Sequence, residues 1–300
     1  MADRTEDRIR SVYRVTVVGF AVNLVLTVAK LAAGIFGRSS AMVADAVHSA
    51  SDFATDLAVL VFVRFSAKPK DDDHDYGHGK YETLATLIIG FALAAVGVGI
   101  CINGVRMIAA VSEGREIPSP EPIALAAAVV SIVVKEWLYR YTAAVGRRVD
   151  SPSVIANAWH HRSDALSSVG TLAGVGLAYF FGGKWRIADP IAAIVVAVLI
   201  LKVAYGLIRS GIDELLEKSL PPEVESEILE IITADKAVTS PHNLRTRRIG
   251  AGIAVDAHIR VNGNMSVNDA HDITVVIERG LKERFGENTI VMIHVEPEKR

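Results

Sequence analysis

The sequence contains a single cysteine, Cys101, among its 300 residues. One thiol excludes a disulfide framework and a metal site built from several thiolates. Basic residues are not in excess either, because the formal net charge is -2 at pH 7. This balance argues against a nucleic-acid partner, since phosphate binding needs a basic surface. The N-terminal residues carry charges but no short apolar core ending in a small-residue cleavage site, so we expect no cleaved signal peptide.

Long apolar stretches are what the sequence has in abundance. Hydrophobic residues make up 51% of the chain, and the mean hydropathy of +0.33 is high for a soluble protein. Six stretches reach the ~20 residues that cross a bilayer. They cover residues 12–36, 40–66, 81–111, 121–146, 152–182 and 187–209. The pattern predicts an all-α membrane bundle of six helices within residues 1–209.

The basic residues between these stretches predict which way the bundle faces. In membrane proteins the cytoplasmic loops carry the excess of lysine and arginine. One side of the predicted bundle has the larger set: Arg4, Arg8, Arg10, Arg64, Lys68, Lys70, Lys80, Arg140, Arg147 and Arg148. The other side has Arg38, Arg115, Lys184 and Arg186. We therefore expect both termini in the cytoplasm, and we expect the host membrane to be a bacterial inner membrane.

The composition changes to that of a soluble domain after about residue 210. A helix is predicted over residues 221–235, after a proline start, and two strands are predicted on either side of Gly250 and Gly252. A second helix over 266–285 and a last strand over 288–297 follow. This α-β-β-α-β order predicts a small α+β cytoplasmic domain over residues 210–300, ferredoxin-like or metallochaperone-like.

Two predicted spans carry ionisable side chains at helical spacing. Asp45, His48 and Asp52 share one helix face, and His160 and Asp164 repeat the four-residue spacing. A rise of about 1.5 Å per residue brings both groups near the bilayer midplane. Such side chains are costly in hydrocarbon and mark functional sites, and two imidazoles with two carboxylates suit tetrahedral zinc. The alternative is that they pair only with one another and hold helices together.

Three neighbouring residues have open roles. For Asp45 and Asp56 the alternatives are support of the ligands from outside, a place at the rim of a water-filled cavity, and chance alignment. His161 lies about 100° around the helix from His160, which favours an accessory role over direct metal binding.

The segment DDDHDYGHGK, between the second and third spans, holds a second candidate metal site. Asp71, His74 and His78 are close enough in sequence to bind one ion from a loop or a helix start. A solvated acidic loop without metal is the alternative.

A third candidate site lies in the cytoplasmic domain. In GIAVDAHIRV the apolar residues alternate with polar ones, so His258 is predicted to face away from the core. His294 and Glu296 share a face of the last strand, His242 opens the first strand, and His271 lies on the last helix. These residues predict a metal cluster, with isolated surface histidines as the alternative.

The segments ADAVHSASD (44–52), KPKDDDHDYGHGKYE (68–82) and NAWHHRSDALSS (157–168), with the six spans and the tail, resemble the cation diffusion facilitators. This family consists of six-span divalent-metal exporters with a cytoplasmic metal-binding domain, and the resemblance covers essentially the whole chain. It implies a membrane transport site at His48, Asp52, His160 and Asp164, in the arrangement of the zinc-preferring branch.

The resemblance also implies features outside the membrane. It places a surface zinc site at Asp71, His74 and His78, and a charge interlock between Lys80 and Glu217. It implies a homodimer with a pair of zinc ions in each tail. One ion would lie among His242, His258 and Glu296, and the other among His258, His271 and His294. Glu296 stands where the family commonly has aspartate.

The function expected from the sequence is zinc efflux in exchange for protons, without enzymatic activity. Histidine must be neutral to bind metal, so protons and Zn²⁺ compete for the same atoms. Zn²⁺ would be the substrate and also a regulatory or structural ligand of the cytoplasmic sites. Fe²⁺, Cd²⁺, Co²⁺ or Mn²⁺ are alternative cargoes. The rival classes are a metal-sensing membrane scaffold without transport, a membrane metallohydrolase and a passive channel.

Overall fold

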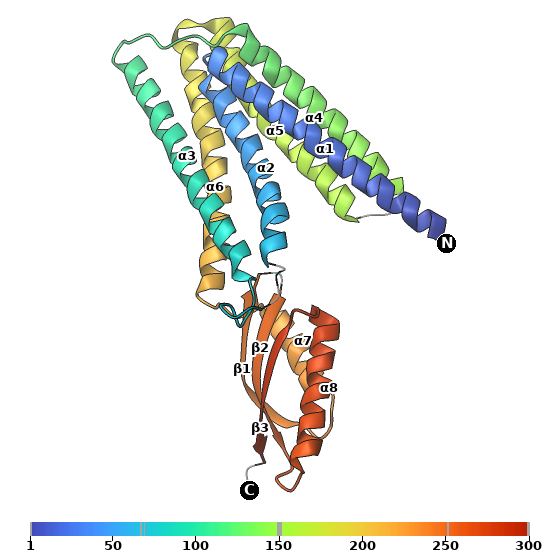
Figure 1. The fold of residues 1–300 in the computed structure, drawn as a ribbon. Coiled ribbons are helices and arrows are strands. Elements are labelled where there is room, and N and C mark those ends of the chain that lie inside the picture. Colours follow the sequence, from blue (N-terminus) through green and yellow to red (C-terminus); the bar gives the residue numbers. More distant parts are fainter. Residues whose placement is uncertain (1, 67, 69, 149–151, 251, 299–300) are drawn as a thin grey trace. The chain divides into compact units, whose positions relative to one another are not determined.

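The computed structural model describes the chain except residues 1, 67, 69, 149–151, 251 and 299–300, and it describes no side chains at 2–12, 54–66, 152–153 and 156. Six long helices come first (Figure 1): α1 (Ala2–Phe36), α2 (Ser40–Ser66), α3 (Lys80–Ser112), α4 (Pro122–Arg148), α5 (Pro152–Phe181) and α6 (Ala188–Leu215). A short 3-10 helix, η1 (Gly183–Ile187), precedes α6. The chain forms two compact units, residues 1–57 with 89–206, and residues 58–88 with 207–300.

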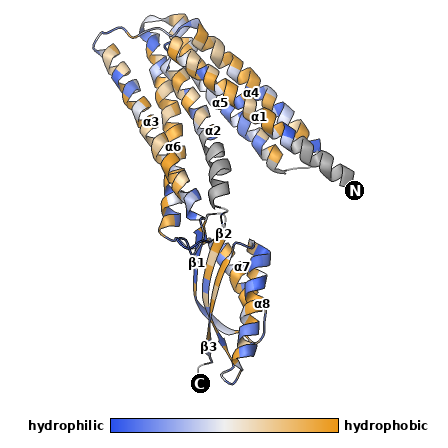
Figure 2. Ribbon diagram, viewed as in Figure 1, coloured by the Kyte–Doolittle hydropathy of each residue, from blue (hydrophilic) through white to orange (hydrophobic). Residues whose placement is uncertain are grey.

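Most of these helices have the length and composition of membrane spans. Among the described residues, the apolar spanning segments are Tyr13–Phe36, Lys80–Ser112, Pro122–Arg148, Asn157–Phe181 and Gly183–Leu215. The second half of α2, residues 54–66, lies outside the described side chains. Large apolar side chains such as Val25, Phe91 and Val133 are exposed on the helices, which are largely apolar along their length (Figure 2). This is the surface expected of helices that face lipid.

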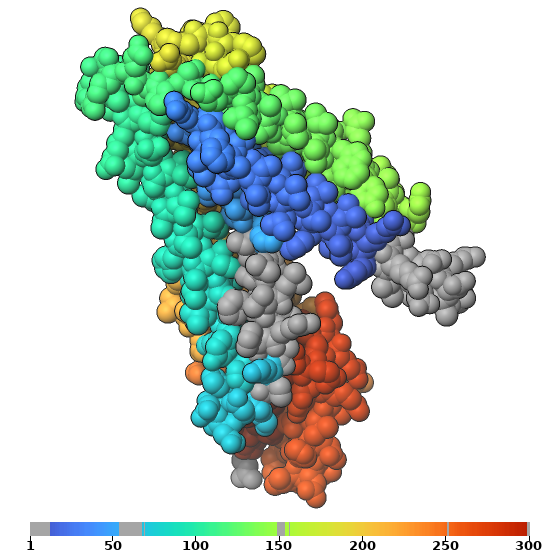
Figure 3. All heavy atoms as spheres, turned by 45° about the horizontal axis from the view of Figure 1, so that its top comes forward, coloured from blue at the N-terminus to red at the C-terminus, as the bar shows by residue number. Residues whose placement is uncertain are grey.

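Small residues bring the helices of the first unit together. A Cβ on Gly174 of α5 would lie 2.4 Å from the Ala192 side chain of α6, and one on Gly104 of α3 would lie 2.6 Å from Ile194. Close helix approach through small residues is typical of membrane proteins. In the same unit α1 packs along α4, as Figure 3 shows, and α4 packs along α5.

The remaining elements follow in the predicted order: α7 (Pro222–Ile232), β1 (Thr239–Ile249), β2 (Gly252–Val261), α8 (Val267–Phe285) and β3 (Ile290–Pro297). The expected fold class, a helical membrane bundle followed by a small α+β domain, is confirmed. The sheet has the order β1-β2-β3, with β1 antiparallel and β3 parallel to β2. Both helices cover one face of it (Figure 1).

Alternation along β2 divides core from surface as predicted. Ile253, Val255, Ala257, Ile259 and Val261 are buried in one core with the apolar faces of α7 and α8. The intervening His258 is half-buried. The register aligns three imidazoles across the strands, because His258 lies opposite His242 on β1 and His294 on β3.

Candidate metal centres

Helices α2 and α5 bring the four predicted membrane ligands together. One ligand atom each from His48, Asp52 and Asp164 lies within 4.8 Å of the other two. The His160 Nε2 atom lies 3.9 Å from Asp52 Oδ2, and its Nδ1 atom lies 4.0 Å from Asp164 Oδ1. These separations exceed those around a bound tetrahedral zinc ion by only roughly 1 Å. The three-residue cluster offers one imidazole and two carboxylates to a cation, and the imidazole of His160 lies beside it.

Two atoms of this cluster make no hydrogen bond to the described residues. His48 Nδ1 and Asp52 Oδ2 are buried without a hydrogen bond from any described residue. Buried polar atoms are normally hydrogen-bonded, so a nitrogen and a carboxylate oxygen of one cluster that both lack a hydrogen bond fit a site for a cation. The His160 side chain is 52% exposed, which leaves one side of the cluster open.

Asp45 is turned away from the cluster and toward α1. Its Oδ2 atom lies 2.8 Å from Lys30 Nζ, and both side chains are 1% exposed. Lys30 also donates to the hydroxyls of Ser49 and Ser168, and Ser168 donates to the Asp45 carboxylate. Asp45 therefore belongs to a buried ion pair that links α1, α2 and α5, and it contributes no atom to the three-residue cluster.

A second buried lysine contacts the cluster itself. Lys135 of α4 donates to Asp164 Oδ2 at 2.5 Å, and the two side chains are 3% and 7% exposed. Our sequence reasoning missed both lysines. The signal was present, because a lysine within an apolar span is as costly as an aspartate and should be read as functional by the same rule.

His161 and Asp56 are two further ionisable residues of these spans. His161 is 3% exposed, and neither ring nitrogen has a hydrogen-bond partner among the described residues. It lies outside the cluster and near α1, since a Cβ on Gly19 would be 3.6 Å from its Nε2 atom. Asp56 lies outside the described side chains.

The loop between α2 and α3 holds a second three-residue cluster. Asp71 Oδ1 lies 3.2 Å from His74 Nδ1, and Asp71 Oδ2 lies 3.2 Å from His78 Nε2. Desolvation raises the pKa of Asp71, but hydrogen bonds from the His74 side chain and from the backbone N–H groups of His74 and Asp73 outweigh it, so the pKa is lower than usual. The carboxylate is thus kept charged between two imidazoles.

The third cluster joins all three strands of the cytoplasmic sheet. Glu296 on β3 lies 3.2 Å from His258 Nδ1 and 3.4 Å from His242 Nε2. The His258 and His294 rings are 4.7 Å apart. His271 is exposed on α8 and belongs to none of the three clusters found among the described residues. The structure thus brings together the residues expected around one ion and places His294, without His271, beside them.

Glu296 also contacts an arginine that the sequence reasoning left out. Arg260 Nε lies 3.4 Å from Glu296 Oε2. The hydrogen bond from His258 lowers the pKa of Glu296 below its ordinary value of 4.5, and the charges of His242 and Arg260 lower it further against desolvation. In the metal-free protein this carboxylate contacts three strand residues, His242, His258 and Arg260.

We expect Glu296→Gln to destabilise the metal-free cytoplasmic domain in a pH-dependent way. Because folding lowers the pKa of Glu296, its contribution is fully present above about pH 4.5 and is lost as the pH falls through the lower folded value. Thermal unfolding of residues 210–300 with chelator, followed by circular dichroism, should show a difference in Tm above about pH 4.5 that shrinks as the pH falls below this value. A matched Glu287→Gln variant, at an exposed residue outside the cluster, should melt like the parent. A difference that grows as the pH falls below about 4.5 would contradict this.

The predicted interlock residues are also close to each other. Lys80 Nζ lies 3.4 Å from Glu217 Oε1, and Arg247 Nε lies 3.7 Å from the same oxygen.

The backbones of the loop and of the β1–β2 turn also approach each other closely. A Cβ on Gly250, which has a positive φ of 56°, would be 2.6 Å from the Gly79 carbonyl oxygen, so only glycine fits there. A cavity of about 680 Å³ is lined by these segments and by the loop histidines His74 and His78.

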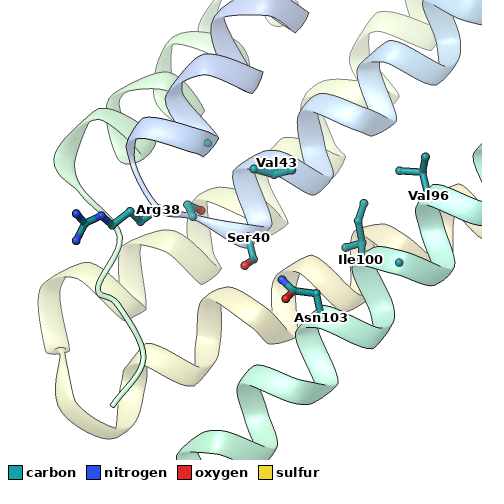
Figure 4. Close-up of a pocket in the computed structure, with 9 residues that line it drawn as sticks. Arg38, Ser40, Val43, Val96, Ile100 and Asn103 are labelled. Carbon is teal, nitrogen blue, oxygen red and sulfur yellow. The ribbon is translucent and has the colours of Figure 1, made fainter. Parts of the chain in front are cut away.

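Another cavity, of about 500 Å³, lies where α1 and α2 meet α3 (Figure 4). Its labelled polar side chains are Ser40, Asn103 and Arg38, and Arg38 points away from the others. It has no carboxylate or imidazole in its lining, so it offers a divalent cation none of the ligands found in the three clusters. The lining residues are Gly34, Arg38, Ser39, Ser40, Val43, Val96, Gly99, Ile100 and Asn103.

Comparison with known families assigns both parts of the chain. Residues 16–216 match the family model of the cation efflux transmembrane domain, and residues 220–298 match that of the cation efflux protein cytoplasmic domain. The chain belongs to the cation efflux family. The resemblance inferred from its motifs is therefore confirmed. As a member of this family, the cation efflux protein is a multi-pass membrane transporter of metal ions and not an enzyme.

Relatives of this cation efflux protein carry names that refer to several metals or roles. The manganese efflux system protein MneP of Bacillus subtilis is 35% identical over 288 residues, which cover 95% of each chain. Metal tolerance protein C1 of Arabidopsis thaliana is 36% identical over 93% of this chain and 61% of its own length. The magnetosome protein MamB of Magnetospira sp. is 32% identical over 93% of this chain and 92% of its own.

Proposed function

We propose that the protein exports zinc in exchange for protons through a site formed by His48, Asp52, His160 and Asp164. The observation that carries the proposal is the convergence of these side chains from α2 and α5, with two buried atoms that make no hydrogen bond to the described residues. Carboxylate and imidazole are both zinc ligands and proton acceptors. The same four side chains can therefore hold either the metal ion or the protons that replace it.

The exchange follows from this competition. Zinc needs neutral imidazole and ionised carboxylate, so each ion that binds displaces protons, and protons that return displace the ion. The exposed side of His160 gives the cytoplasmic ion a way into the site. Rocking of helices around a fixed site would then open it to the other side, where protons replace the ion. In this orientation both termini lie in the cytoplasm. We propose a bacterial inner membrane as the host membrane.

Zinc is the proposed cargo because half of the ligand set is imidazole. Manganese prefers harder oxygen ligands, whereas imidazole suits zinc, cobalt and iron. The name of the manganese efflux relative, at 35% identity, makes manganese the second candidate. Iron, cadmium and cobalt share enough ligand chemistry to remain alternatives.

The two clusters outside the transport site are proposed zinc sites of a homodimer. The loop cluster offers Asp71, His74 and His78, and the tail cluster offers His242, His258 and Glu296. His271 and His294 would join a second tail ion, as in the family pattern. Metal binding to the tails of two copies would draw them together, and the pair between Lys80 and Glu217 would pass this on to the membrane helices.

Uptake of radiolabelled zinc into proteoliposomes under an imposed pH gradient tests the exchange. We expect the initial rate to rise with the gradient and to collapse when an ionophore removes it. The same vesicles loaded in parallel with manganese, iron, cobalt and cadmium should rank zinc first. Flux that is independent of the gradient would contradict proton exchange, and a higher rate for manganese would contradict the zinc assignment. Absence of any metal flux would favour the scaffold alternative.

A further inference from the structure

Asp164 stands between the transport site and a buried cation. Its Oδ1 atom faces His160 Nδ1 at 4.0 Å, whereas its Oδ2 atom accepts a hydrogen bond from Lys135 Nζ at 2.5 Å. Both partners of this ion pair are almost fully buried, at 3% and 7% exposure of their side chains. The ammonium group therefore lies one carboxylate away from the position of a bound metal ion.

Lys30, the second buried lysine, shows that an ion pair can link helices without contacting a metal cluster. Lys30 is held by Asp45 and by the hydroxyls of Ser49 and Ser168, and none of these residues belongs to a metal cluster. For Lys135 the described structure offers one ion-pair partner, Asp164, which is part of the cluster. Helices α4 and α5 also pack along one another, so the ion pair is not their only contact.

We propose that Lys135 is a positioning residue that weakens the transport site for divalent cations and so permits their release. This inference rests on the proposed function. In the metal-binding state both carboxylates are ionised, so Asp52 and Asp164 bring two negative charges to the cluster. The ion-paired ammonium of Lys135 brings one positive charge, so the local sum is -1 instead of -2. In a poorly solvated site this difference strongly reduces the attraction of a dication. The hydrogen bond also fixes Asp164 with Oδ1 toward the other ligands.

A calorimetric titration of the purified full-length protein with Zn²⁺ tests this. To isolate the transport site, the parent chain carries His74→Ala and His258→Ala, which remove a ligand from each of the other two clusters. We expect Lys135→Met, which keeps the length of the side chain without its charge, to bind zinc at least about tenfold more tightly. In vesicles it should lower both the half-saturating zinc concentration and the maximal rate.

Two further variants separate charge from structure. Lys135→Arg keeps the charge and should bind zinc within about threefold of the parent. The double variant Lys30→Met with Asp45→Asn removes a buried ion pair without a net change of charge, and should also stay within about threefold. Lys135→Gln, neutral but able to hydrogen-bond, repeats the main comparison if the methionine variant does not fold.

The outcomes distinguish this inference from the proposed function. If the parent binds no zinc, or if Asp52→Ala in the same background leaves binding unchanged, the proposed transport site is wrong. If the parent binds zinc through Asp52 but the neutral variants at Lys135 bind no more tightly, Lys135 does not set the affinity. Weaker binding by these variants would make the lysine a purely structural tie and overturn the inference.

Discussion

Asp52→Ala is expected to abolish transport, with a fall of at least ~100-fold in the initial rate of zinc uptake. Asp52 contributes to the cluster a buried oxygen without a hydrogen bond, Oδ2, which lies 3.9 Å from His160 Nε2. Loss of a residue that merely supports a metal ligand costs about 10- to 100-fold in affinity or activity. Loss of the ligand itself removes a metal contact, a negative charge and a proton acceptor at once, so the effect should be larger. Proteoliposomes with a fixed pH gradient give the measurement.

A matched change in the loop controls for general damage. Asp72 is exposed and lies in none of the three clusters, so Asp72→Ala should transport at the parental rate. Calorimetry should show that Asp52→Ala still binds zinc at the loop and tail clusters. An Asp52→Ala protein that keeps more than a tenth of the parental rate would show that the ion crosses by another route.

The arrangement of side chains within each helix and strand could be predicted from the sequence, because the periodicity of the element determines which side chains share a face. Four-residue spacing placed His48 with Asp52 and His160 with Asp164, and alternation separated His258 from the core. The convergence of the two helix pairs followed from counting depth in the bilayer, and the structure places these residues together. Local rules therefore predicted which residues could meet.

Partners on other helices could not be predicted in the same way. Whether Asp45 points to the cluster or to Lys30 depends on how α1 and α2 are rotated against each other, which spacing along one helix leaves open. The contact of Lys135 with Asp164 depends on the packing of α4 against α5. His271 shows the same limit, because a position on α8 does not tell whether its side chain reaches the strands.

These contacts between helices give the proposed transport site a charge balance that its four proposed ligands alone do not have. Two buried aspartates, Asp45 and Asp164, are each matched by a lysine from a neighbouring helix. One pair lies outside the metal cluster and the other contacts it. The pair outside the cluster is therefore the place to measure what a buried charge contributes to the fold without changing the ligands.

Lys30→Met should destabilise the membrane unit by about 3–5 kcal/mol, because it leaves the Asp45 carboxylate buried without its cation. Thermal unfolding in detergent can be followed by tryptophan fluorescence, since Trp137, Trp159 and Trp185 all lie in this unit. Adding Asp45→Asn to the same chain should restore most of the loss, because a neutral pair of similar size carries no uncompensated charge.

The contrast between the single and the double variant identifies the cause. Loss of packing alone would leave both variants equally unstable, whereas an unpaired charge predicts recovery in the double variant. Lys184→Met, at an exposed lysine, should shift stability by no more than about 0.5 kcal/mol. If Lys30→Met unfolds like this control, Asp45 is not held as a charged group by Lys30. Its place beside the transport site would then have to be explained by something other than the ion pair.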